Sequence, residues 1–466
     1  MVRVIGGGFA GAEAAWQLAR AGIPCVLSEM RPARQTPAHK TGNLAELVCS
    51  NSFKAQRLGS AAGTLKAEME LLGSLCVETA QRTRVPAGGA LAVDREAFSR
   101  EITRRVEAEP LIELVREEVT RIPEDGMAII AAGPLASDAL AADIQRLCGG
   151  GLHFYDAAAP IVAAESIDMR RAFFSSRYDR GGEDDYLNCP MNKEQYEAFE
   201  AALLSAERAY IHAFDVPGAP AKPAGFVGWV YEGCMPIEVL ASRGKDAIRF
   251  GPMKPVGLRD PNTGRRPWAV LQLRRENTQG SLYNLVGFQT NLKFGEQRRV
   301  FGMIPALAHA EFARYGVMHR NTFLDSPRIL NEDFSCKLRE GLCFAGQITG
   351  VEGYMESAAS GILAGRNLAR ALQGLPPLKL PPVTMLGALS RYISDQSIKD
   401  FQPMGANFGI LPGPVERIRD KKARYEALGE RAVGAMAGAL GGASPGGKNA
   451  APTAFSQPQA RLTHIL

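Results

Sequence analysis

Apolar and polar positions in the first thirty residues predict a short strand, a helix and a second strand. The range 2–5 is a short apolar run of strand length, and 23–27 is a second one. Between them, the range 12–21 has helix-forming composition with apolar residues at helical spacing. A glycine-rich turn at 6–11 joins the first strand to the helix. This order is typical of the βαβ unit that binds a dinucleotide.

The glycines of this turn meet different physical needs. Gly6 permits a tight turn, Gly8 lets the backbone approach a pyrophosphate, and Gly11 lets the helix pack closely on the strand. The N-terminus of the helix then offers free N–H groups and a positive dipole end to the phosphates. Glu29 follows the second strand, where it can accept the hydroxyl groups of an adenosine ribose, which favours FAD or NAD over NADP. The alternative is a glycine-rich turn that binds nothing.

After this unit the pattern changes character. Helical spacing covers 60–75 and 94–108, and an apolar strand at 127–134 ends in a Gly-Pro turn. Such a strand commonly returns the chain to a dinucleotide-binding sheet. Aromatic and polar residues then alternate within 155–325, which predicts an inserted, strand-rich domain. The alternation is clearest at 226–231, 268–273 and 282–288.

A second strand-loop-helix element near the end predicts the return of the first sheet. Residues 341–346 have the pattern of a short buried strand that ends at Gly346, and the loop 347–353 after it ends at Gly353. The range 356–372 is an Ala- and Gly-rich helix, which we expect to pack closely on a sheet. An element of this kind often closes a flavin site, so its pairing with the N-terminal motif favours FAD over NAD. The alternative is a plain β-α element.

Together these elements predict an α/β fold: a Rossmann-like FAD-binding domain of the glutathione-reductase type with an inserted α+β, strand-rich domain. The range 385–430 has the pattern of a small helical cap. The last residues are rich in Ala, Gly, Ser and Pro with few large apolar side chains, which predicts disorder. The expected segments are 1–154 for the first part of the FAD-binding domain, 155–325 for the insertion, 326–433 for the second part with its cap, and 434–466 for a disordered tail.

Composition restricts the location and the partners of the chain. Its 466 residues are 46% hydrophobic, and no apolar run reaches 18 residues, so we expect no membrane span. The first motif begins at residue 2, which leaves no room for a signal peptide, so we expect a cytoplasmic protein. Eight cysteines form no CxxC pair and no cluster with histidine, which predicts free thiols and no metal site.

Charge is concentrated in the insertion. Residues 221–320 hold 15 Lys and Arg against seven acidic residues, while the whole chain has a net charge of +5. These cations alternate with Tyr, Trp and Phe, a combination that suits phosphate contacts and base stacking. A solvated basic face explains the charge equally well, because no RNA-binding module signature is present.

Two cysteines stand in sequence surroundings that suit chemistry. Cys49 follows the cofactor motif closely, in a polar stretch with basic residues on both sides that favour a thiolate. Cys234 lies between Gly233 and Pro236, which presents its thiol on a sharp turn. An ordinary half-buried or loop cysteine is as good an explanation of each from the local pattern alone.

Longer sequence motifs resemble one family, the folate- and FAD-dependent tRNA (uracil-5-)-methyltransferases (TrmFO), which are related to the MnmG/GidA flavoproteins. The motifs occur in the same order over about residues 2–370. Long matching motifs are far more specific than a glycine pattern. Unlike the larger GidA relative, this chain lacks a long C-terminal helical extension. The matching motifs are residues 4–16, 36–39, 45–52, 231–239, 249–257, 283–290, 315–322 and 345–354.

The resemblance implies a specific reaction. Methylenetetrahydrofolate gives a one-carbon unit, and reduced FAD serves as methylene carrier and reductant. A cysteine thiolate adds to C6 of the uracil at position 54 of the tRNA T loop, which makes C5 a nucleophile and leads to 5-methyluridine. NADH or NADPH restores the reduced flavin. The implied partners are tRNA and folate, with no membrane and no obligate protein partner.

The resemblance also assigns residues. It implicates Cys49 and Cys234. We interpret Cys234 as the uracil nucleophile and Cys49 as the thiol near the flavin, and the exchanged assignment is the alternative. The implied FAD contacts are Gly6, Gly8, Gly11, Glu29, Gly346 and Gly353. Two departures are visible: residues 39–44 read His-Lys-Thr-Gly-Asn-Leu where family members often have His-His-Thr-Asp-Lys-Phe, and the tail has no counterpart.

Two other functions remain open on the sequence. The glycine elements suit an FAD-dependent oxidoreductase that acts on a small molecule equally well, although the basic insertion and Cys234 do not. The third hypothesis is a non-enzymatic flavoprotein that binds RNA or senses redox state. The intact sequence motifs around both cysteines argue against it.

Overall fold

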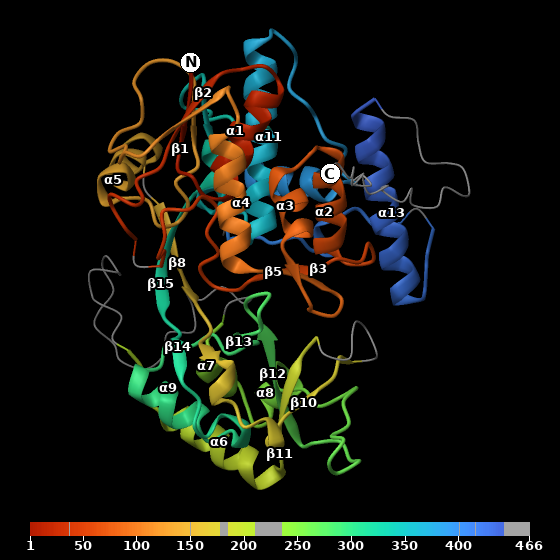
Figure 1. Ribbon diagram of the computed structural model, residues 1–466. Helices are drawn as coiled ribbons and strands as arrows, with labels where there is room; N and C mark the ends of the chain where they lie inside the picture. Colours follow the sequence, from red (N-terminus) through yellow and green to blue (C-terminus); the bar gives the residue numbers. More distant parts are fainter. Residues whose placement is uncertain are drawn as a thin grey trace, which may run out of the picture.

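The computed structural model describes residues 1–36, 38–149, 151–177, 185–209, 235–399, 401–414 and 416–441. Figure 1 shows two bodies, one above the other. The upper body, here called the main domain, contains the N-terminal elements and the segments after residue 325. The lower body, here called the insert domain, contains the elements between Ile161 and Arg314.

A five-stranded parallel sheet forms the centre of the main domain. Its strand order is β16-β7-β1-β2-β6, so the first strand lies in the middle. Every residue of β7 and β16 is buried, as expected for a parallel sheet covered on both faces. The strands are β1 (Val2–Ile5), β2 (Cys25–Ser28), β6 (Ile112–Val115), β7 (Ala128–Ile130) and β16 (Leu342–Phe344). This arrangement confirms the predicted α/β class.

Helices surround this sheet in the positions that apolar spacing predicted. The expected helix at 60–75 is α2 with the beginning of α3, and the one at 94–108 is α4. A small antiparallel sheet, in the order β3-β5-β4, lies below them. The elements are α1 (Phe9–Arg20), α2 (Ala61–Leu71), α3 (Leu75–Arg82), α4 (Arg95–Glu107), α5 (Asp138–Cys148), α10 (Ser326–Ile329), α11 (Tyr354–Leu372), β3 (Ser52–Ala55), β4 (Arg84–Val85) and β5 (Ala90–Val93).

The glycine-rich helix α11 packs side by side with α1 (Figure 1). A Cβ atom at Gly361 would lie 2.1 Å from the carbonyl oxygen of Ala10, and one at Gly365 would lie 2.6 Å from that of Ala14. The sequence led us to expect a close contact with the sheet, but the closest approach is to a helix. The small residues of both helices therefore serve a helix–helix contact, and this contact places both helix N-termini at the same edge of the sheet.

The insert domain is built on a six-stranded antiparallel sheet with the order β10-β11-β12-β13-β9-β14. Its apolar face packs against α6 and α9 to form a second hydrophobic core. The predicted strands at 268–273 and 282–288 correspond to β12 and β13, whereas the one at 226–231 lies outside the described residues. The elements are β9 (Ile161–Ala163), β10 (Phe173–Phe174), β11 (Leu187–Met191), β12 (Ala269–Arg275), β13 (Leu282–Leu285), β14 (Phe312–Arg314), α6 (Lys193–Ser205), α7 (Ile237–Ala241), α8 (Ala247–Phe250) and α9 (Phe294–Phe301).

A two-stranded antiparallel ribbon joins the two bodies. Strand β8 (Gly151–Ala157) leads from the main domain into the insert, and β15 (Met318–Leu324) leads back. Both lie between the two bodies in Figure 1. The chain therefore leaves and re-enters the main domain at one place. Short 3-10 turns complete the fold: Ala164–Ser166, Met169–Arg171, Pro305–Leu307, Gln347–Thr349 and Phe408–Ile410.

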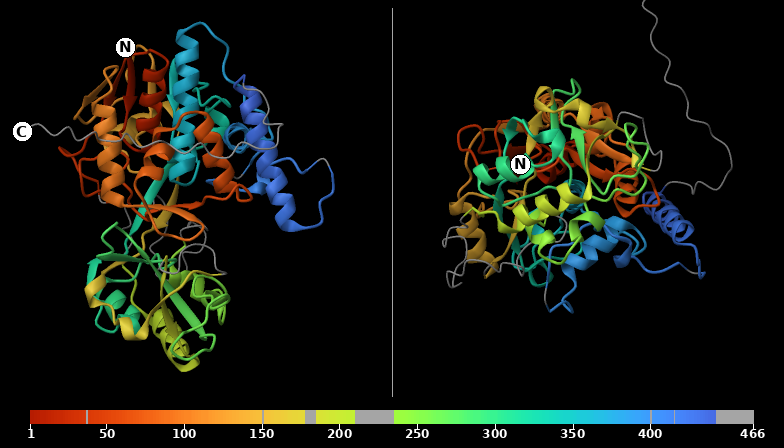
Figure 2. Two further views of the ribbon diagram at one scale, coloured as in Figure 1. Left: turned by 45° about the vertical axis from the view of Figure 1, so that its right-hand side comes forward. Right: turned by 90° about the horizontal axis from the view of Figure 1, so that it is seen from below.

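The C-terminal part adds α12 (Met385–Ser394) and α13 (Lys421–Ala439). Figure 2 shows α13 on the outside of the main domain, away from the insert. This helix runs to Ala439, so it occupies the first residues of the range 434–466 that we expected to be a disordered tail. Residues 442–466 lie outside the described part. Among the helices that the structure describes, none is long and apolar enough to cross a bilayer.

Replacement of Gly361 by alanine tests the α1–α11 contact. The added methyl group would meet the backbone of Ala10, so we expect the free energy of unfolding to fall by about 1–3 kcal/mol. We also expect less bound cofactor, because the shift displaces the start of α1. Gly434→Ala is the matched control: its Cβ meets nothing within 4 Å, and it should stabilise α13 by up to about 1 kcal/mol. Urea unfolding measures both changes; equal stability of the two variants would contradict the prediction.

Candidate functional site

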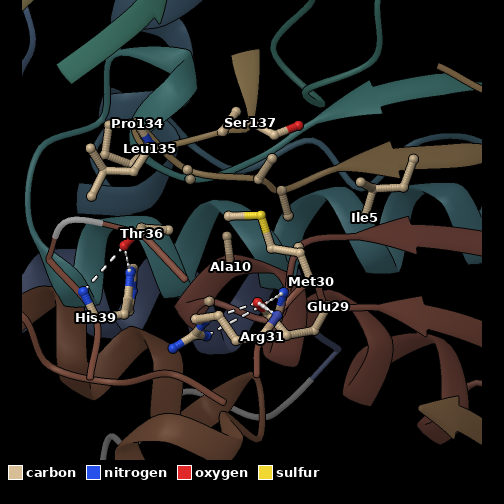
Figure 3. A pocket seen from close by; sticks show the side chains of 18 of the residues that line it. Ile5, Ala10, Glu29, Met30, Arg31, Thr36, His39, Pro134, Leu135 and Ser137 are labelled. Atoms are coloured by element: carbon tan, nitrogen blue, oxygen red, sulfur yellow. Dashed lines mark hydrogen bonds and ion pairs between the residues drawn. The ribbon is translucent and has the colours of Figure 1, made fainter. Parts of the chain in front are cut away.

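A pocket opens at the carboxyl ends of the parallel strands, where ligands bind in sheets of this type. Its lining includes the turn between β1 and α1, the end of β2 and the loop after it, the residues after β6, β7 and β16, and the start of α11. Figure 3 shows side chains of these segments converging, with Ile5, Ala10 and Glu29 from one side and Pro134 and Ser137 from the other. The two glycine-bearing elements found in the sequence therefore meet in one place.

The glycines of the first turn have the environments that a phosphate cradle requires. Gly6 has a φ of +102°, and a Cβ atom on it would lie 2.5 Å from the oxygen of Ala131. Gly11 approaches the Gly6 carbonyl so closely that a Cβ atom has no room. By contrast, a Cβ atom on Gly8 would meet nothing within 4 Å. Gly8 also begins α1 without any side chain capping the helix, so its first N–H groups are available to an anion.

Glu29 lies buried at the end of β2 and on the pocket wall. Its Oε2 accepts a hydrogen bond of 2.8 Å from the Gly7 N–H, and its Oε1 accepts one of 2.9 Å from Arg31 Nε. Burial acts to raise the pKa of Glu29, but the bonds and the charge of Arg31 outweigh burial and lower it. Glu29 is therefore an anion beside the glycine turn, as a ribose acceptor must be.

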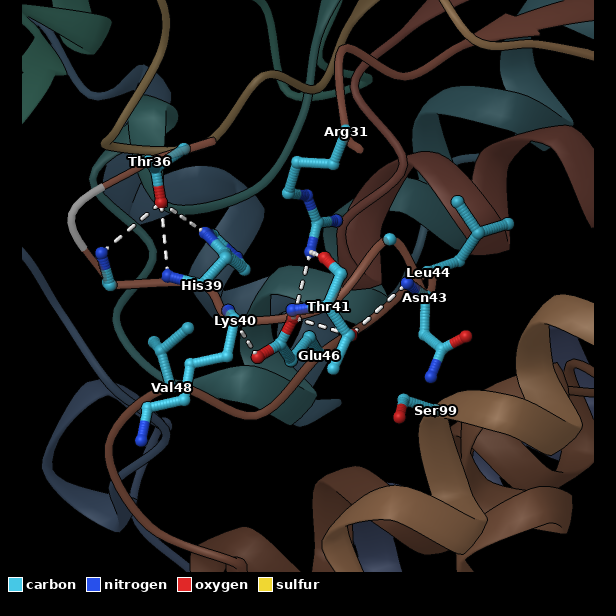
Figure 4. Close-up of polar contacts among 12 residues, drawn as sticks. Arg31, Thr36, His39, Lys40, Thr41, Asn43, Leu44, Glu46, Val48 and Ser99 are labelled. Carbon is cyan, nitrogen blue, oxygen red and sulfur yellow. Dashed lines mark hydrogen bonds and ion pairs between the residues drawn. The ribbon is translucent and has the colours of Figure 1, made fainter. Parts of the chain in front are cut away.

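Glu46 organises the loop that follows, a role that the sequence did not indicate. Its carboxylate accepts hydrogen bonds from the N–H groups of Lys40 and Thr41, at 2.9 and 3.0 Å, and from the Thr41 hydroxyl at 2.8 Å. Arg31 Nη1 lies 3.2 Å from the same carboxylate. Figure 4 shows these contacts in one network. Arg31 thus joins Glu29 to the loop in which the sequence departs from the family pattern.

His39 belongs to the same loop and lines the pocket. Its Nδ1 lies 2.6 Å from the Thr36 hydroxyl, whose oxygen also accepts the His39 N–H at 3.1 Å. Figure 3 and Figure 4 show this short turn at the pocket edge. His39, which begins the stretch 39–44, is therefore held by Thr36, three positions before it in the chain.

The second glycine element contributes differently at its two positions. Gly346 has a φ of +86°, lines the pocket, and donates its N–H to Ser360 Oγ at 2.7 Å. Gly353 has a φ of +121° and immediately precedes α11, but it is not among the lining residues. A Cβ atom on Gly353 would meet the Glu356 carboxylate. Gly353 thus shapes the backbone that begins α11, while Gly346 faces the pocket.

Cys49 lies beside this pocket, in contact with the first residue of α11. Its Sγ is 3.0 Å from the Tyr354 hydroxyl oxygen. The same oxygen accepts the N–H groups of Val48 and Cys49 at 2.9 and 2.8 Å. The Tyr354 ring stacks on Phe9 with centroids 4.7 Å apart. Burial first, and then the charge of Cys49, raises the pKa of Tyr354 well above its usual value, so it remains a neutral hydroxyl.

Two arginines from different domains contact the backbone on the N-terminal side of Cys49. Arg95, at the start of α4, donates to the Leu47 carbonyl, and its Nε lies 2.9 Å from Glu276 Oε2. Arg314, at the end of β14, donates to the Val48 carbonyl. The charges of Cys49 and Tyr354 act on both guanidinium groups. The thiol therefore lies in an electropositive environment that long-range contacts create.

A third arginine, Arg274 of the insert domain, holds the residues after Cys49. Arg274, only 5% exposed, donates from Nε to Asn51 Oδ1 at 2.9 Å and from Nη2 to Ser50 Oγ at 2.8 Å. The Asn51 amide in turn donates to the carbonyls of Val93 and Arg275 at 2.9 and 2.8 Å. Side chains of both domains thus hold the segment 47–51. We call these side chains, those of Arg95, Arg274, Arg314 and Tyr354, the Cys49 clasp.

The structure places the remaining cysteines away from this site or does not describe them. Cys234 lies outside the described residues. The helix α7 that follows it is anchored by Glu238, whose carboxylate accepts from the Thr290 hydroxyl at 2.9 Å and from the Asn291 N–H at 2.7 Å. In the described part of the chain every cysteine is a free thiol, and no group of three potential metal ligands occurs there. The thiols of Cys25, Cys76, Cys189, Cys336 and Cys343 are buried.

Comparison with known proteins gives three consistent matches. The family model described as "Glucose inhibited division protein A" matches residues 1–376. A methylenetetrahydrofolate--tRNA-(uracil-5-)-methyltransferase TrmFO of Enterococcus faecalis is 54% identical over 94% of this chain and 98% of its own length. One of Pelotomaculum thermopropionicum is 57% identical over 93% of this chain and 96% of its own length.

The solved structure of Aquifex aeolicus GidA has the same fold. It aligns with a TM-score of 0.65 at 17% identity, over 93% of this chain and 73% of that chain. The match includes the main domain and the insert, which confirms the predicted FAD-domain architecture with an inserted domain. With relatives above 50% identity along nearly their whole length, the chain belongs to the methylenetetrahydrofolate--tRNA-(uracil-5-)-methyltransferases, the TrmFO family, within the wider GidA family.

Proposed function

We propose that this protein methylates C5 of uracil in tRNA, at position 54 of the T loop, with methylenetetrahydrofolate as the carbon donor. The observation that carries the proposal is the Cys49 thiol, held 3.0 Å from Tyr354 beside a dinucleotide pocket and between arginines of two domains. A small-molecule oxidoreductase needs the pocket but has no need of this thiol. The names of the relatives support the same reaction.

The pocket fits FAD on the evidence of its own geometry. Gly6 and Gly11 leave no room for a side chain, while open space above Gly8 and the uncapped start of α1 suit a pyrophosphate. In this proposal Glu29 accepts ribose hydroxyls, and Gly346 and Gly353 shape the wall near the flavin ring. When bound and reduced, FAD supplies the electrons for the reaction and carries the one-carbon unit.

The protein's own task is to make the uracil carbon reactive. Uracil C5 is a poor nucleophile until a thiolate forms a bond to C6, which shifts the C5–C6 electron pair onto C5. C5 then bonds to the one-carbon unit. Loss of the C5 proton breaks the bond between that carbon and its carrier, and hydride transfer to the same carbon completes the methyl group while the C5–C6 double bond re-forms and the thiolate leaves C6. We assign the thiolate to Cys234 and a place beside the flavin to Cys49. The exchanged assignment remains the alternative.

The remaining parts of the proposal concern the reductant of the flavin, the cellular location of the protein and the surface that binds tRNA. NADH or NADPH reduces the flavin after each turnover, because the reaction consumes two electrons from it. Since its substrate is tRNA and the described part of the chain has no membrane-spanning helix, we infer that the protein acts in the cytoplasm. The basic surface of the insert domain supplies the charge that a tRNA backbone requires.

One assay tests the reaction. It combines the yellow holoprotein, an unmodified tRNA transcript, NADPH and methylenetetrahydrofolate labelled in its methylene carbon. We expect label in 5-methyluridine and none when labelled S-adenosylmethionine replaces the folate. Continued NADPH oxidation without labelled tRNA would overturn the proposal in favour of the small-molecule oxidoreductase.

Replacement of the two cysteines tests their roles. Cys234→Ala should retain bound FAD and its absorption spectrum while methylation falls to background, because no thiolate then adds to C6. Cys148→Ala is the control, since Cys148 lies half-buried at the opposite end of α5 from the pocket-lining residues Ser137 and Leu140, and its activity should equal that of the native protein. Native activity in Cys234→Ala would exclude Cys234 as the nucleophile and transfer the role to Cys49.

Replacement of Arg274 tests the Cys49 clasp. Arg274→Leu removes two hydrogen bonds from a charged donor, so we expect the free energy of unfolding to fall by about 3 kcal/mol. The loosened segment should also let iodoacetamide alkylate Cys49 faster, as measured by mass spectrometry of its peptide. Arg274→Lys, which keeps the charge and one bond, should lie between. The exposed Arg265→Leu serves as the control with an unchanged rate; an alkylation rate equal to this control in folded Arg274→Leu would contradict the clasp.

A further inference from the structure

Three aromatic rings of the insert domain form a column at its surface. The rings of Phe312 and Tyr315 are stacked with centroids 5.2 Å apart and planes within 6°. Tyr315 and Phe294 continue the stack at 4.7 Å and 16°. Phe312 lies in β14, Tyr315 directly follows that strand, and Phe294 begins α9; Figure 1 shows β14 and α9 next to each other. Near-parallel stacking of three successive rings outside a hydrophobic core is the geometry of a platform for flat ligands.

The column is rigid at its inner end and exposed at its outer end. Phe312 packs against the core of the insert domain. Arg298 donates to the Tyr315 hydroxyl at 3.1 Å, and the Gln297 side chain binds both the N–H and the carbonyl of Gly316 at 2.8 Å. The outermost ring, Phe294, is 53% exposed. A large apolar ring held in this way offers its surface to a partner at little cost in conformational entropy.

The surroundings of the column are basic. Helix α9 carries Arg298 and Arg299, and Lys293 precedes it. Arg299 pairs with Glu296 at 2.6 Å, and Lys293 lies 2.5 Å from Glu207. Arg298 reaches the aromatic column instead. The segment thus combines a positive charge with an exposed aromatic ring, the combination that binds single-stranded nucleic acid.

The column is also tied to the chemical site. Arg314 lies between Phe312 and Tyr315 in the chain, and its guanidinium contacts the Val48 carbonyl next to Cys49. Consecutive Cα atoms are about 3.8 Å apart, so Tyr315 begins one residue from a side chain of the Cys49 clasp. A nucleotide beside the target base passes close to this point when the target lies at the pocket.

We propose that the Phe294–Tyr315–Phe312 column binds an unpaired nucleobase of the tRNA next to the target uracil, with the base stacked on Phe294. This inference rests on the proposed function, since extrusion of the target base leaves its neighbours without their stacking partner. The column replaces that partner and fixes the strand while the target is held at the pocket. Stacking alone reads no sequence, so the column positions the loop and leaves base choice to the pocket.

The test compares tRNA affinity across variants of the FAD-bound, full-length protein. Phe294→Ala should weaken binding of a fluorescein-labelled, unmodified tRNA transcript about tenfold, because loss of one stacked base has an effect of that order. Phe294→Trp should keep native affinity, and the new indole fluorescence should be quenched when tRNA binds. Leu338→Ala is the matched control: Leu338 is also 53% exposed but lies in the main domain, and its affinity should not change.

Three results would overturn the inference. The first is a dissociation constant for Phe294→Ala within twofold of the native value, and the second is an indole signal that tRNA leaves unchanged. The third is a change in oligomeric state of Phe294→Ala by light scattering, because the ring would then be a contact between copies of the protein. Failure of the proposed function gives a different pattern, because the native protein would then neither bind nor methylate tRNA.

Discussion

The close contact between α1 and α11 is the constraint on which the site depends. Glycine at Gly361 and Gly365 lets the two helices approach to backbone distance at Ala10 and Ala14. Their N-termini consequently open at the same edge of the sheet. The start of α1 leaves its first N–H groups available to an anion, and the start of α11 places Tyr354 against the Cys49 thiol. A phosphate cradle and a held thiol thus derive from a single packing contact.

The second constraint is electrostatic and crosses the two bodies of the molecule. Arg274 and Arg314 come from the insert domain, and Arg95 comes from the main domain, yet all three bind the segment that carries Cys49. A buried guanidinium group is tolerated only where acceptors satisfy it, and for Arg274 the side-chain oxygens of Asn51 and Ser50 do so. The position of the thiol is therefore a property of the domain interface, and the insert contributes side chains to the site.

Much of the main domain was predictable because its signals are local. Glycine spacing, the acid after β2 and apolar runs of strand length all lie within a few residues of the element that they predict. The family resemblance singled out Cys49 as a candidate but gave no indication of its partners. Tyr354 is some three hundred positions away in the chain and Arg274 more than two hundred, and no periodicity reports a contact of that separation.

Other features escaped prediction for related reasons. Glu46 reads as one more charged residue in a polar stretch, and only the fold shows that its carboxylate collects the N–H groups of the loop. The Gly-rich face of α11 indicated close packing but not its partner, because small residues suit a helix and a sheet equally. The helical end of α13 overran the predicted tail since Ala supports a helix while Gly and Ser around it suggested disorder.

The position of the insert has a consequence for synthesis of the protein. Strand β16 pairs with β7, although the whole insert domain lies between them in the chain. The parallel sheet and the α1–α11 contact therefore cannot be completed on the ribosome until the insert has emerged. The insert, whose sheet is antiparallel and whose core is its own, is free to fold first. Among the segments that line the nucleotide pocket, Gly346 and the start of α11 are thus the last to arrive, so a chain truncated before them lacks that wall of the pocket.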